Sequence, residues 1–219
     1  MKKNIAYLCM ICVTSLYPHI STADSVERFQ MNESEMIENE RAGLTKPITY
    51  HASCKSIATI DSMKPAGKLE SGKDIDLILI SKKTRQIYLL NENKVIFKHP
   101  VTFGRAFDKG PKIQEGDNRT PEGIYSIDYK NLDSKFHKSL HISYPSKYDR
   151  EFAKQNGLSV GGDIMIHGLP NYKGNANDAK SDRFNRRNWT AGCVATRNST
   201  TDQMINIIKI NTTVAICPL

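Results

Sequence analysis

The chain has 219 residues, 39% of them hydrophobic, and carries 31 Lys and Arg against 23 Asp and Glu, a formal net charge of +8. This length suits one good-sized core with an additional arm, and the composition is that of a soluble protein. The lysines are scattered among acidic residues instead of forming a basic stripe with interleaved aromatics. The charge therefore predicts no nucleic-acid partner.

The first 23 residues are typical of a secretory signal. Lys2 and Lys3 precede a short apolar stretch at 5–17, and Ser21-Thr22-Ala23 supplies the small residues that a signal peptidase reads. The apolar stretch is too short to span a bilayer as a stable helix, and no later segment could cross a membrane. We interpret 1–23 as cleaved, with an uncleaved anchor as the alternative. We expect the mature chain, without an integral membrane span, in the periplasm or cell envelope.

Removal of the signal leaves three cysteines, Cys54, Cys193 and Cys217. An odd number in an oxidising compartment indicates one pair and one free thiol. Cys54 and Cys217 flank the region that carries the catalytic pattern, which makes them the natural pair. Neither needs a partner if both are simply buried.

The composition of residues 24–73 predicts an N-terminal arm and a connector. The segment is polar and acidic at first, and Pro and Gly interrupt its second half. Short apolar runs after this point predict strands: 76–81, 85–90, 95–101, 123–127, 139–144, 163–167 and 212–217. One helix is expected near 200–209, where Ser199 and Asp202 resemble a capping box. Residues 74–219 are thus expected to form a mainly β domain, a β-sandwich or barrel with one helix in its C-terminal half and small helical attachments.

Two short motifs suggest chemistry. Cys193 follows Gly192 in a turn, and His167 ends an apolar run and is followed by Gly168. A thiol and an imidazole form a nucleophile–base pair if the fold brings them together, and the imidazole can then lower the thiol pKa. Gly192 would let the backbone approach a substrate, and nearby N–H groups could form an oxyanion hole.

Other catalytic patterns are missing from the sequence. It has no CxxC, HxxxH or HExxH spacing for zinc, no G-x-S-x-G for a serine hydrolase and no glycine-rich phosphate loop. We therefore expect neither a metal nor a cofactor.

From residue 74 onward, the ordered motifs resemble the YkuD-type L,D-transpeptidases, cysteine enzymes that remodel bacterial peptidoglycan. The motifs that carry the resemblance are Pro100–Gly104, Glu115–Tyr125, Ser139–Pro145, Asp149-Arg150, Gly162–Gly168 and Thr190–Cys193, with Asn198 five residues beyond. Many members carry Arg two residues after the nucleophile, where this chain has Ala195. This ending and the EGDNRTPEG segment are more similar to the YafK-like branch.

The resemblance implies a YkuD fold and attack by Cys193 on a peptidoglycan stem peptide, at the carbonyl of its diamino acid, with loss of D-Ala. Transfer of the thioester to the side-chain amine of a second stem gives a 3→3 cross-link. Transfer to water makes the protein an L,D-carboxypeptidase or endopeptidase. His167 is the implied base, oriented by a neighbouring backbone carbonyl instead of an Asp, with Gly168 and Gly192 as flanking site residues.

Five residues are candidates for substrate binding. Arg119 and Arg150 can hold a stem carboxylate bidentately, or form ordinary surface salt bridges. Trp189 can wall the thiol site or anchor the adjacent loop in the core. Thr190 and Asn198 are the remaining candidates, because Thr190 begins the Thr190–Cys193 motif and Asn198 lies five residues beyond it.

The long polar connection at 169–188 is expected to form a lid, a binding loop or a plain solvated loop. Two other functions compete with the leading one. The first is an inert wall-binding module in which Cys193 is structural, and the second is a general cysteine peptidase.

Overall fold

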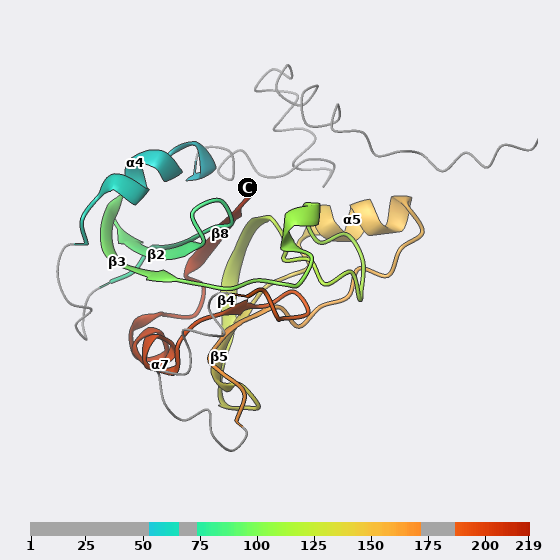
Figure 1. Cartoon of the computed structure of the whole chain (residues 1–219). Helices are drawn as coiled ribbons and strands as arrows, with labels where there is room; N and C mark the ends of the chain where they lie inside the picture. The colour runs from blue at the N-terminus through green and yellow to red at the C-terminus, as the bar shows by residue number, and fades with distance from the viewer. Residues whose placement is uncertain (1–52, 66–73, 172–186) are drawn as a thin grey trace, which may run out of the picture. The chain divides into compact units, whose positions relative to one another are not determined.

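The computed structural model describes residues 53–65, 74–171 and 187–219 (Figure 1). The predicted signal at 1–23 and most of the predicted arm lie outside these ranges. Within them, no helix has both the length and the apolar character needed to cross a membrane.

Eight strands form one mixed sheet in the order β3-β2-β1-β8-β4-β5-β6-β7. Their bounds are β1 Leu77–Ser81, β2 Gln86–Asn91, β3 Lys94–Pro100, β4 Gly123–Ser134, β5 His137–Ile142, β6 Met165–His167, β7 Val194–Ala195 and β8 Thr213–Cys217. The mainly β prediction is confirmed.

The parallel pair of β1 and β8 lies inside this sheet, with Ile78 opposite Val214 and Ile80 opposite Ile216. Both strands are near-continuous apolar runs and are buried over almost their whole length. Such runs are typical of strands covered on both faces.

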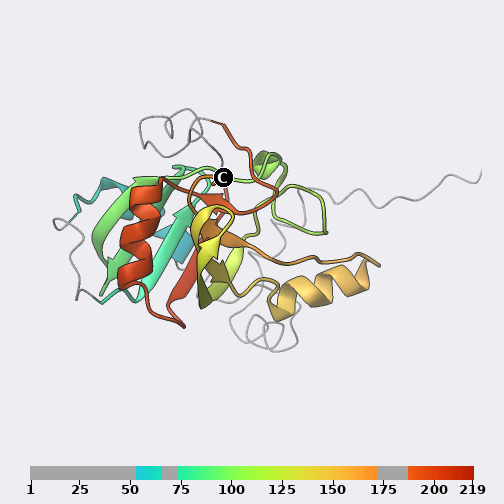
Figure 2. The same cartoon turned by 90° about the horizontal axis from the view of Figure 1, so that it is seen from below.

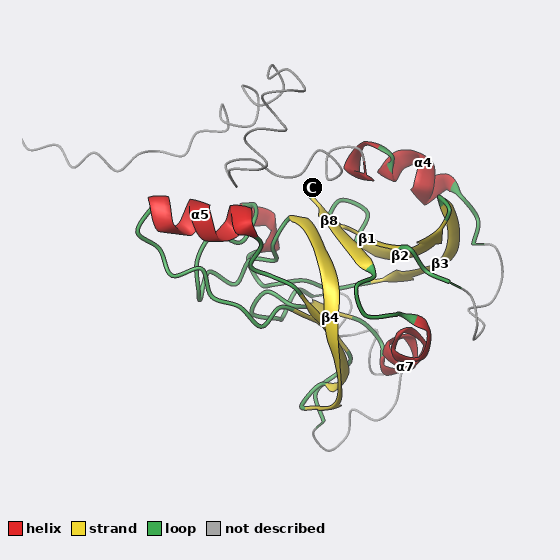
Figure 3. Cartoon of the chain, turned by 180° about the vertical axis from the view of Figure 1, so that it is seen from behind, coloured by secondary structure: helices red, strands yellow, loops and turns green. Residues whose placement is uncertain are grey.

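Strand β4 joins the two halves of the sheet (Figure 3). Its beginning, Gly123–Ser126, pairs with β8, and from Ile127 onward it pairs with β5. It is longer than the predicted 123–127 because its second half lies in a polar, partly exposed hairpin without an apolar run.

Beyond β3, Thr102 bridges Ala195 and Gly104 bridges Thr190. These bridges bring the chain after β3 beside β7, at the far end of the strand order. The sheet therefore curves toward a barrel, and the segment around Thr190 is held from two sides.

Helix α7 (Asn198–Ile207) lies alongside the strands (Figure 2) and buries Met204 and Ile205 in the main core. It begins earlier than predicted. Its N-cap is Arg197, without a side-chain cap, so the predicted capping box of Ser199 and Asp202 is wrong. The short 3-10 helix η2 spans Phe107–Lys109.

A second long helix, α5 (Lys147–Gln155), was not predicted. It begins with a complete capping box between Ser146 and Asp149, which the sequence contains as a Ser-x-x-Asp signal. The helix is strongly polar and offers only Tyr148, Phe152 and Ala153 as apolar residues, too few for the helix prediction to recognise.

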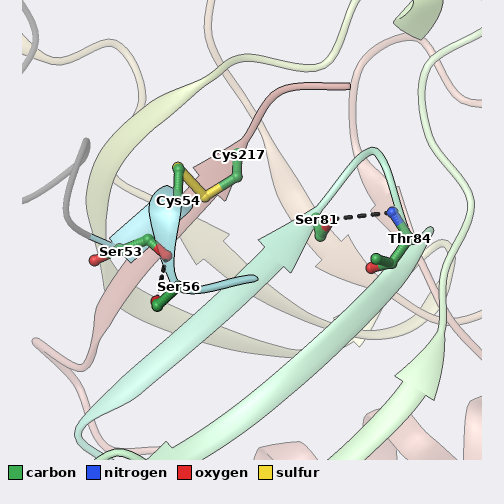
Figure 4. Close-up of a disulfide and its surroundings, with 6 residues drawn as sticks. All are labelled: Ser53, Cys54, Ser56, Ser81, Thr84 and Cys217. Carbon is green, nitrogen blue, oxygen red and sulfur yellow. Dashed lines mark hydrogen bonds between the residues drawn. A yellow bond between two sulfur atoms is a disulfide. The ribbon is translucent and has the colours of Figure 1, made fainter. Parts of the chain in front are cut away.

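The predicted connector contains the short helix α4 (Ile57–Ser62). The structure also decides whether Cys54 and Cys217 are paired or merely buried. Cys54 and Cys217 form a disulfide that ties the turn before α4 to the end of β8 (Figure 4). Ile57 and Ile60 pack against a second cluster of buried residues on the sheet, which includes Tyr88. The structure confirms this pairing and leaves Cys193 as the free thiol.

We expect this disulfide to contribute substantially to stability because it closes a loop with a sequence separation of 163 residues. The double variant Cys54→Ala, Cys217→Ala should lose about 2–5 kcal/mol of unfolding free energy, measured by urea denaturation of the oxidised proteins. Wild type under reducing conditions should show a similar loss. Equal stability of the oxidised wild type and the double variant would contradict the prediction.

Candidate active site

The pairing of β6 with β7 places Cys193 and His167 on one face of the sheet. Ile166 lies opposite Val194, and His167 lies opposite Ala195. Cys193 directly precedes Val194 and so lies level with Met165, two residues from His167. Paired residues, and residues two apart on a strand, share a face. The thiol and the imidazole therefore project from neighbouring strands to the same side.

The Cys193 thiol is held by two backbone groups of the segment that leads into β6. The Met165 N–H donates to Sγ at 3.4 Å, and the thiol lies 3.5 Å from the Asp163 carbonyl oxygen. Burial raises the pKa of Cys193, and the Met165 N–H offsets part of that effect. The expected lowering of the thiol pKa is therefore not found, because loss of hydration outweighs the favourable contacts.

His167 is fixed by its own chain. Its Nδ1 lies 2.7 Å from the Gly168 carbonyl oxygen, and because a carbonyl can only accept, Nδ1 carries the hydrogen. This confirms the expected backbone partner. No other hydrogen bond of this ring involves the described residues, so Nε2 has no partner among them. Burial lowers the pKa of His167 to about 4, and the bond to Gly168 opposes that shift.

Two aromatic rings pack against the imidazole. The Phe136 ring centroid lies 4.7 Å from that of His167, and the Trp189 centroid lies 5.6 Å away in an edge-on arrangement. The two aromatic rings are also 6.0 Å from each other. Trp189 thus lies beside the base. Phe136 was missed by the sequence analysis, because a single apolar residue in a polar hairpin gives no local sign of such a contact.

Thr190 shapes the turn that presents the nucleophile. Its hydroxyl donates to the Cys193 carbonyl at 2.7 Å and accepts from the Gly192 N–H at 3.2 Å. The Gly192 N–H is therefore already engaged, whereas the Cys193 N–H interacts with its own thiol and lowers the thiol pKa. Of the two amides expected to form an oxyanion hole, that of Gly192 is thus occupied by the Thr190 hydroxyl.

The turn also rests on the loop at 110–122. A Cβ on Gly192 would lie 2.8 Å from the Arg119 carbonyl oxygen, and Gly192 has a φ of +143°. A Cβ on Gly104 would lie 2.2 Å from the Asn118 carbonyl oxygen. Only glycine permits these approaches, so backbone packs directly against backbone beneath Cys193.

Buried charges hold this loop in place. Lys82 is fully buried, and its Nζ lies 2.7 Å from both Glu122 Oε1 and the Thr120 carbonyl oxygen. Burial lowers the pKa of Lys82, and the Glu122 carboxylate opposes that shift. Lys112 contacts Asp117 at 3.1 Å in the same loop. The sequence analysis missed these pairs because the partners are distant or look like ordinary surface charges.

The predicted substrate-binding residues have different surroundings. Arg119 is half-buried, and within the described ranges its guanidinium makes no hydrogen bond or ion pair. Arg150 lies on α5 and donates to the Pro145 carbonyl. The Asn198 side-chain oxygen accepts from the Leu169 N–H at 2.8 Å and so supports the chain just after Gly168. The binding roles of these residues, of Trp189 and of Thr190 stay predictions, and most of the predicted lid at 169–188 lies outside the described residues.

The depressed pKa of His167 predicts a dependence of stability on pH. The unfolded imidazole titrates near 6.5 and the folded one at about 4, so the unfolded chain binds the proton first. The stability from the neutral buried ring is fully present above pH 6.5 and is lost as pH falls to about 4. The shift corresponds to about 3 kcal/mol.

Urea denaturation of wild type and His167→Asn at pH 7 and pH 4 measures this effect. Wild type should lose about 3 kcal/mol more than the variant over that interval. Other titrating groups are common to both proteins and cancel in the comparison. Equal losses in the two proteins would show that His167 does not carry the pH dependence.

Known proteins share this arrangement of motifs. The model of the L,D-transpeptidase catalytic domain, YkuD, matches residues 75–216. YafK of Escherichia coli is 39% identical over 61 residues, which make up 27% of this chain and 23% of YafK.

Solved structures provide further similarities. The helical cell shape determining protein Pgp2 of Campylobacter jejuni is 20% identical with a TM-score of 0.47, over 76% of this chain and 55% of Pgp2. Bd1075 of Bdellovibrio bacteriovorus is 22% identical with a TM-score of 0.45, over 71% of this chain and 53% of Bd1075. The matches thus span about a quarter of YafK and about half of each of these two proteins. With the family model covering most of its length, the chain belongs to the YkuD family of L,D-transpeptidase catalytic domains.

Proposed function

We propose that this protein remodels peptidoglycan as an L,D-transpeptidase that forms a thioester on Cys193. Family membership supports the reaction class. The observation that carries the assignment of residues is the β6–β7 register, which puts Cys193 and His167 on one face while Gly168 holds the imidazole by Nδ1. A structural cysteine would have no need for an adjacent, oriented base.

In the first half-reaction, His167 Nε2 takes the thiol proton as Cys193 Sγ attacks the carbonyl of the diamino acid in a stem peptide. The Cys193 N–H donates to the developing oxyanion. Collapse of the tetrahedral intermediate breaks the bond to D-Ala, whose amine receives the proton from the imidazolium. The products of this half-reaction are a thioester on Cys193 and free D-Ala.

In the second half-reaction, the side-chain amine of another stem attacks the thioester. A C–N bond forms, the C–S bond breaks, and the proton of the amine passes through His167 to the departing sulfur. The product is a 3→3 cross-link. Water in place of the amine would release a shortened stem and make the protein a carboxypeptidase or endopeptidase.

The electrostatics of the resting site favour coupled proton transfer over a preformed ion pair. Burial raises the pKa of Cys193 and lowers that of His167, which disfavours the charged form of each. As negative charge develops on the substrate, it stabilises the imidazolium that forms beside it. Proton transfer thus becomes favourable only when a substrate is present to be attacked.

The guanidinium of Arg119 is half-buried and has no partner among the described residues, and the Arg119 backbone carbonyl lies against the turn that carries Cys193. Both observations support a role for Arg119 in binding a stem carboxylate. The signal-like sequence at 1–23 and the disulfide are consistent with a location in the periplasm or cell envelope, where peptidoglycan is accessible.

Incubation of the purified protein with defined tetrapeptide muropeptides, followed by mass analysis of the products, tests this function. Cross-linked dimers that have lost one D-Ala are the expected result, and shortened monomers would identify water as the acceptor. Casein should remain uncleaved. Unchanged muropeptides would support an inert wall-binding module, and cleavage of casein would support a general cysteine peptidase.

A further inference from the structure

A row of side chains crosses the sheet from the nucleophile to an exposed aromatic ring. Tyr129 on β4 lies opposite His141 on β5, and His141 lies opposite Met165 on β6. Met165 is level with Cys193 in the β6–β7 register. Neighbouring strands are about 4.8 Å apart, so the row extends roughly 14 Å from the thiol on the face that also carries His167.

The outer end of the row is a fixed aromatic platform. The Tyr129 ring stacks on the His141 imidazole with centroids 4.5 Å apart and planes 12° from parallel. His141 Nδ1 lies 2.5 Å from Asp128 Oδ1, which fixes the orientation of the imidazole. Tyr129 is nevertheless 44% exposed, and its phenol has no hydrogen bond with any described residue. A large ring is thus held rigid and left open to a ligand.

A carboxylate, that of Asp163, lies beside this row, two residues before Met165. Asp163 is exposed, and its side chain has no hydrogen bond or ion pair within the described ranges, while its carbonyl contacts Cys193 Sγ. Burial raises the pKa of both the Cys193 thiol and the Tyr129 phenol, and in each case the Asp163 carboxylate raises it further. The charge of Asp163 therefore acts on both ends of the row.

An open ring face and an unpaired carboxylate together attract an organic cation. An ammonium gains from the quadrupole of the ring and from the negative charge, and these interactions strengthen when a ligand excludes water. The ring of Tyr129 also offers apolar area for the methylene groups of a side chain that carries the ammonium. In a chain with a net charge of +8, this unpaired carboxylate beside the nucleophile makes the site locally attractive to cations.

We propose that Tyr129, His141 and Asp163 form the subsite for the acceptor, and that it binds the ammonium-bearing side chain of the second stem peptide. This inference rests on the proposed function, which requires an amine to reach the thioester. Tyr129 and Asp163 bind the protonated amine of this side chain, and His141 holds the Tyr129 ring in position. The ammonium releases one proton to solvent and leaves the ring as a free amine, whose electron pair attacks the thioester carbonyl; its second proton passes through His167 to the departing sulfur.

Binding to the Cys193→Ala protein tests this subsite without any chemistry. Calorimetric titration compares a stem tripeptide that has a free side-chain amine with the same peptide acetylated at that amine. We expect the free amine to bind about tenfold more tightly. In the same background, Tyr129→Leu and Asp163→Asn should each reduce this preference to twofold or less, whereas Tyr129→Phe, which keeps the ring, should retain it.

Asp133→Asn is the matched control, because Asp133 is an exposed carboxylate on β4, the strand of Tyr129, but lies outside the row. It should keep the tenfold preference, and thermal unfolding should confirm that every variant is folded. Equal affinities for the two peptides would overturn the subsite, as would a preference that survives Tyr129→Leu and Asp163→Asn. Failure of the proposed function would show separately, as unchanged muropeptides with the unmodified protein.

Discussion

Replacement of Cys193 by Ala should abolish turnover of muropeptides, with a loss of roughly 10,000-fold or more. The thiol is the free cysteine of the described chain, and the β6–β7 register places it on the same face as His167. Without it the thioester cannot form, and the alanine leaves no hydroxyl to replace the sulfur. Release of D-Ala from a tetrapeptide substrate measures the effect.

The fold should survive this change, since Cys193 is only half-buried and its contacts through sulfur are two long ones. The double variant Cys54→Ala, Cys217→Ala is the matched control. It also removes sulfur but keeps Cys193, so it should retain activity at temperatures where it remains folded. Substantial D-Ala release by folded Cys193→Ala would refute the assignment of the nucleophile.

Replacement of His167 by Ala should lower kcat/KM by about 100-fold or more, the usual cost of losing a general base. The shape of the pH profile should change as well. Wild type should be nearly constant from pH 5 to pH 8, because the imidazole protonates only at about 4 and the thiol pKa is raised. The variant should speed up steadily as pH rises, because only preformed thiolate can attack.

His99→Ala, a change to a half-buried histidine next to the end of β3, is the control and should behave as wild type. Thermal unfolding separates loss of the base from loss of the fold. A His167→Ala profile with the same shape as that of wild type would remove His167 from the role of base.

Local patterns in the sequence predicted the centre of the sheet well. The strands β1, β2 and β8 lie within a residue or two of their predicted bounds, because buried strands are short runs of apolar residues between polar turns. The second half of β4 and helix α5 were missed for the opposite reason. Both are polar, and pairing in a hairpin and a capping box stabilise them in place of an apolar face.

The two candidate catalytic residues, Cys193 and His167, could be proposed from the sequence because each lies in a short motif that also occurs in a known family. Their environment could not. The Phe136 ring, the Met165 N–H and the Lys82–Glu122 pair reach the site or its supporting loop through sheet pairing and long-range packing. The thiol pKa was expected to fall, and burial raises it, because the extent of burial depends on the whole fold.

The most direct test of a thioester on Cys193 is the intact mass of the protein, acid-quenched during turnover of a tetrapeptide muropeptide. We expect a transient increase equal to the mass of the substrate minus that of D-Ala, located on the peptide that contains Cys193 and absent from Cys193→Ala. Rapid product formation by a protein that never carries this mass, or that carries it on another residue, would contradict covalent catalysis by Cys193.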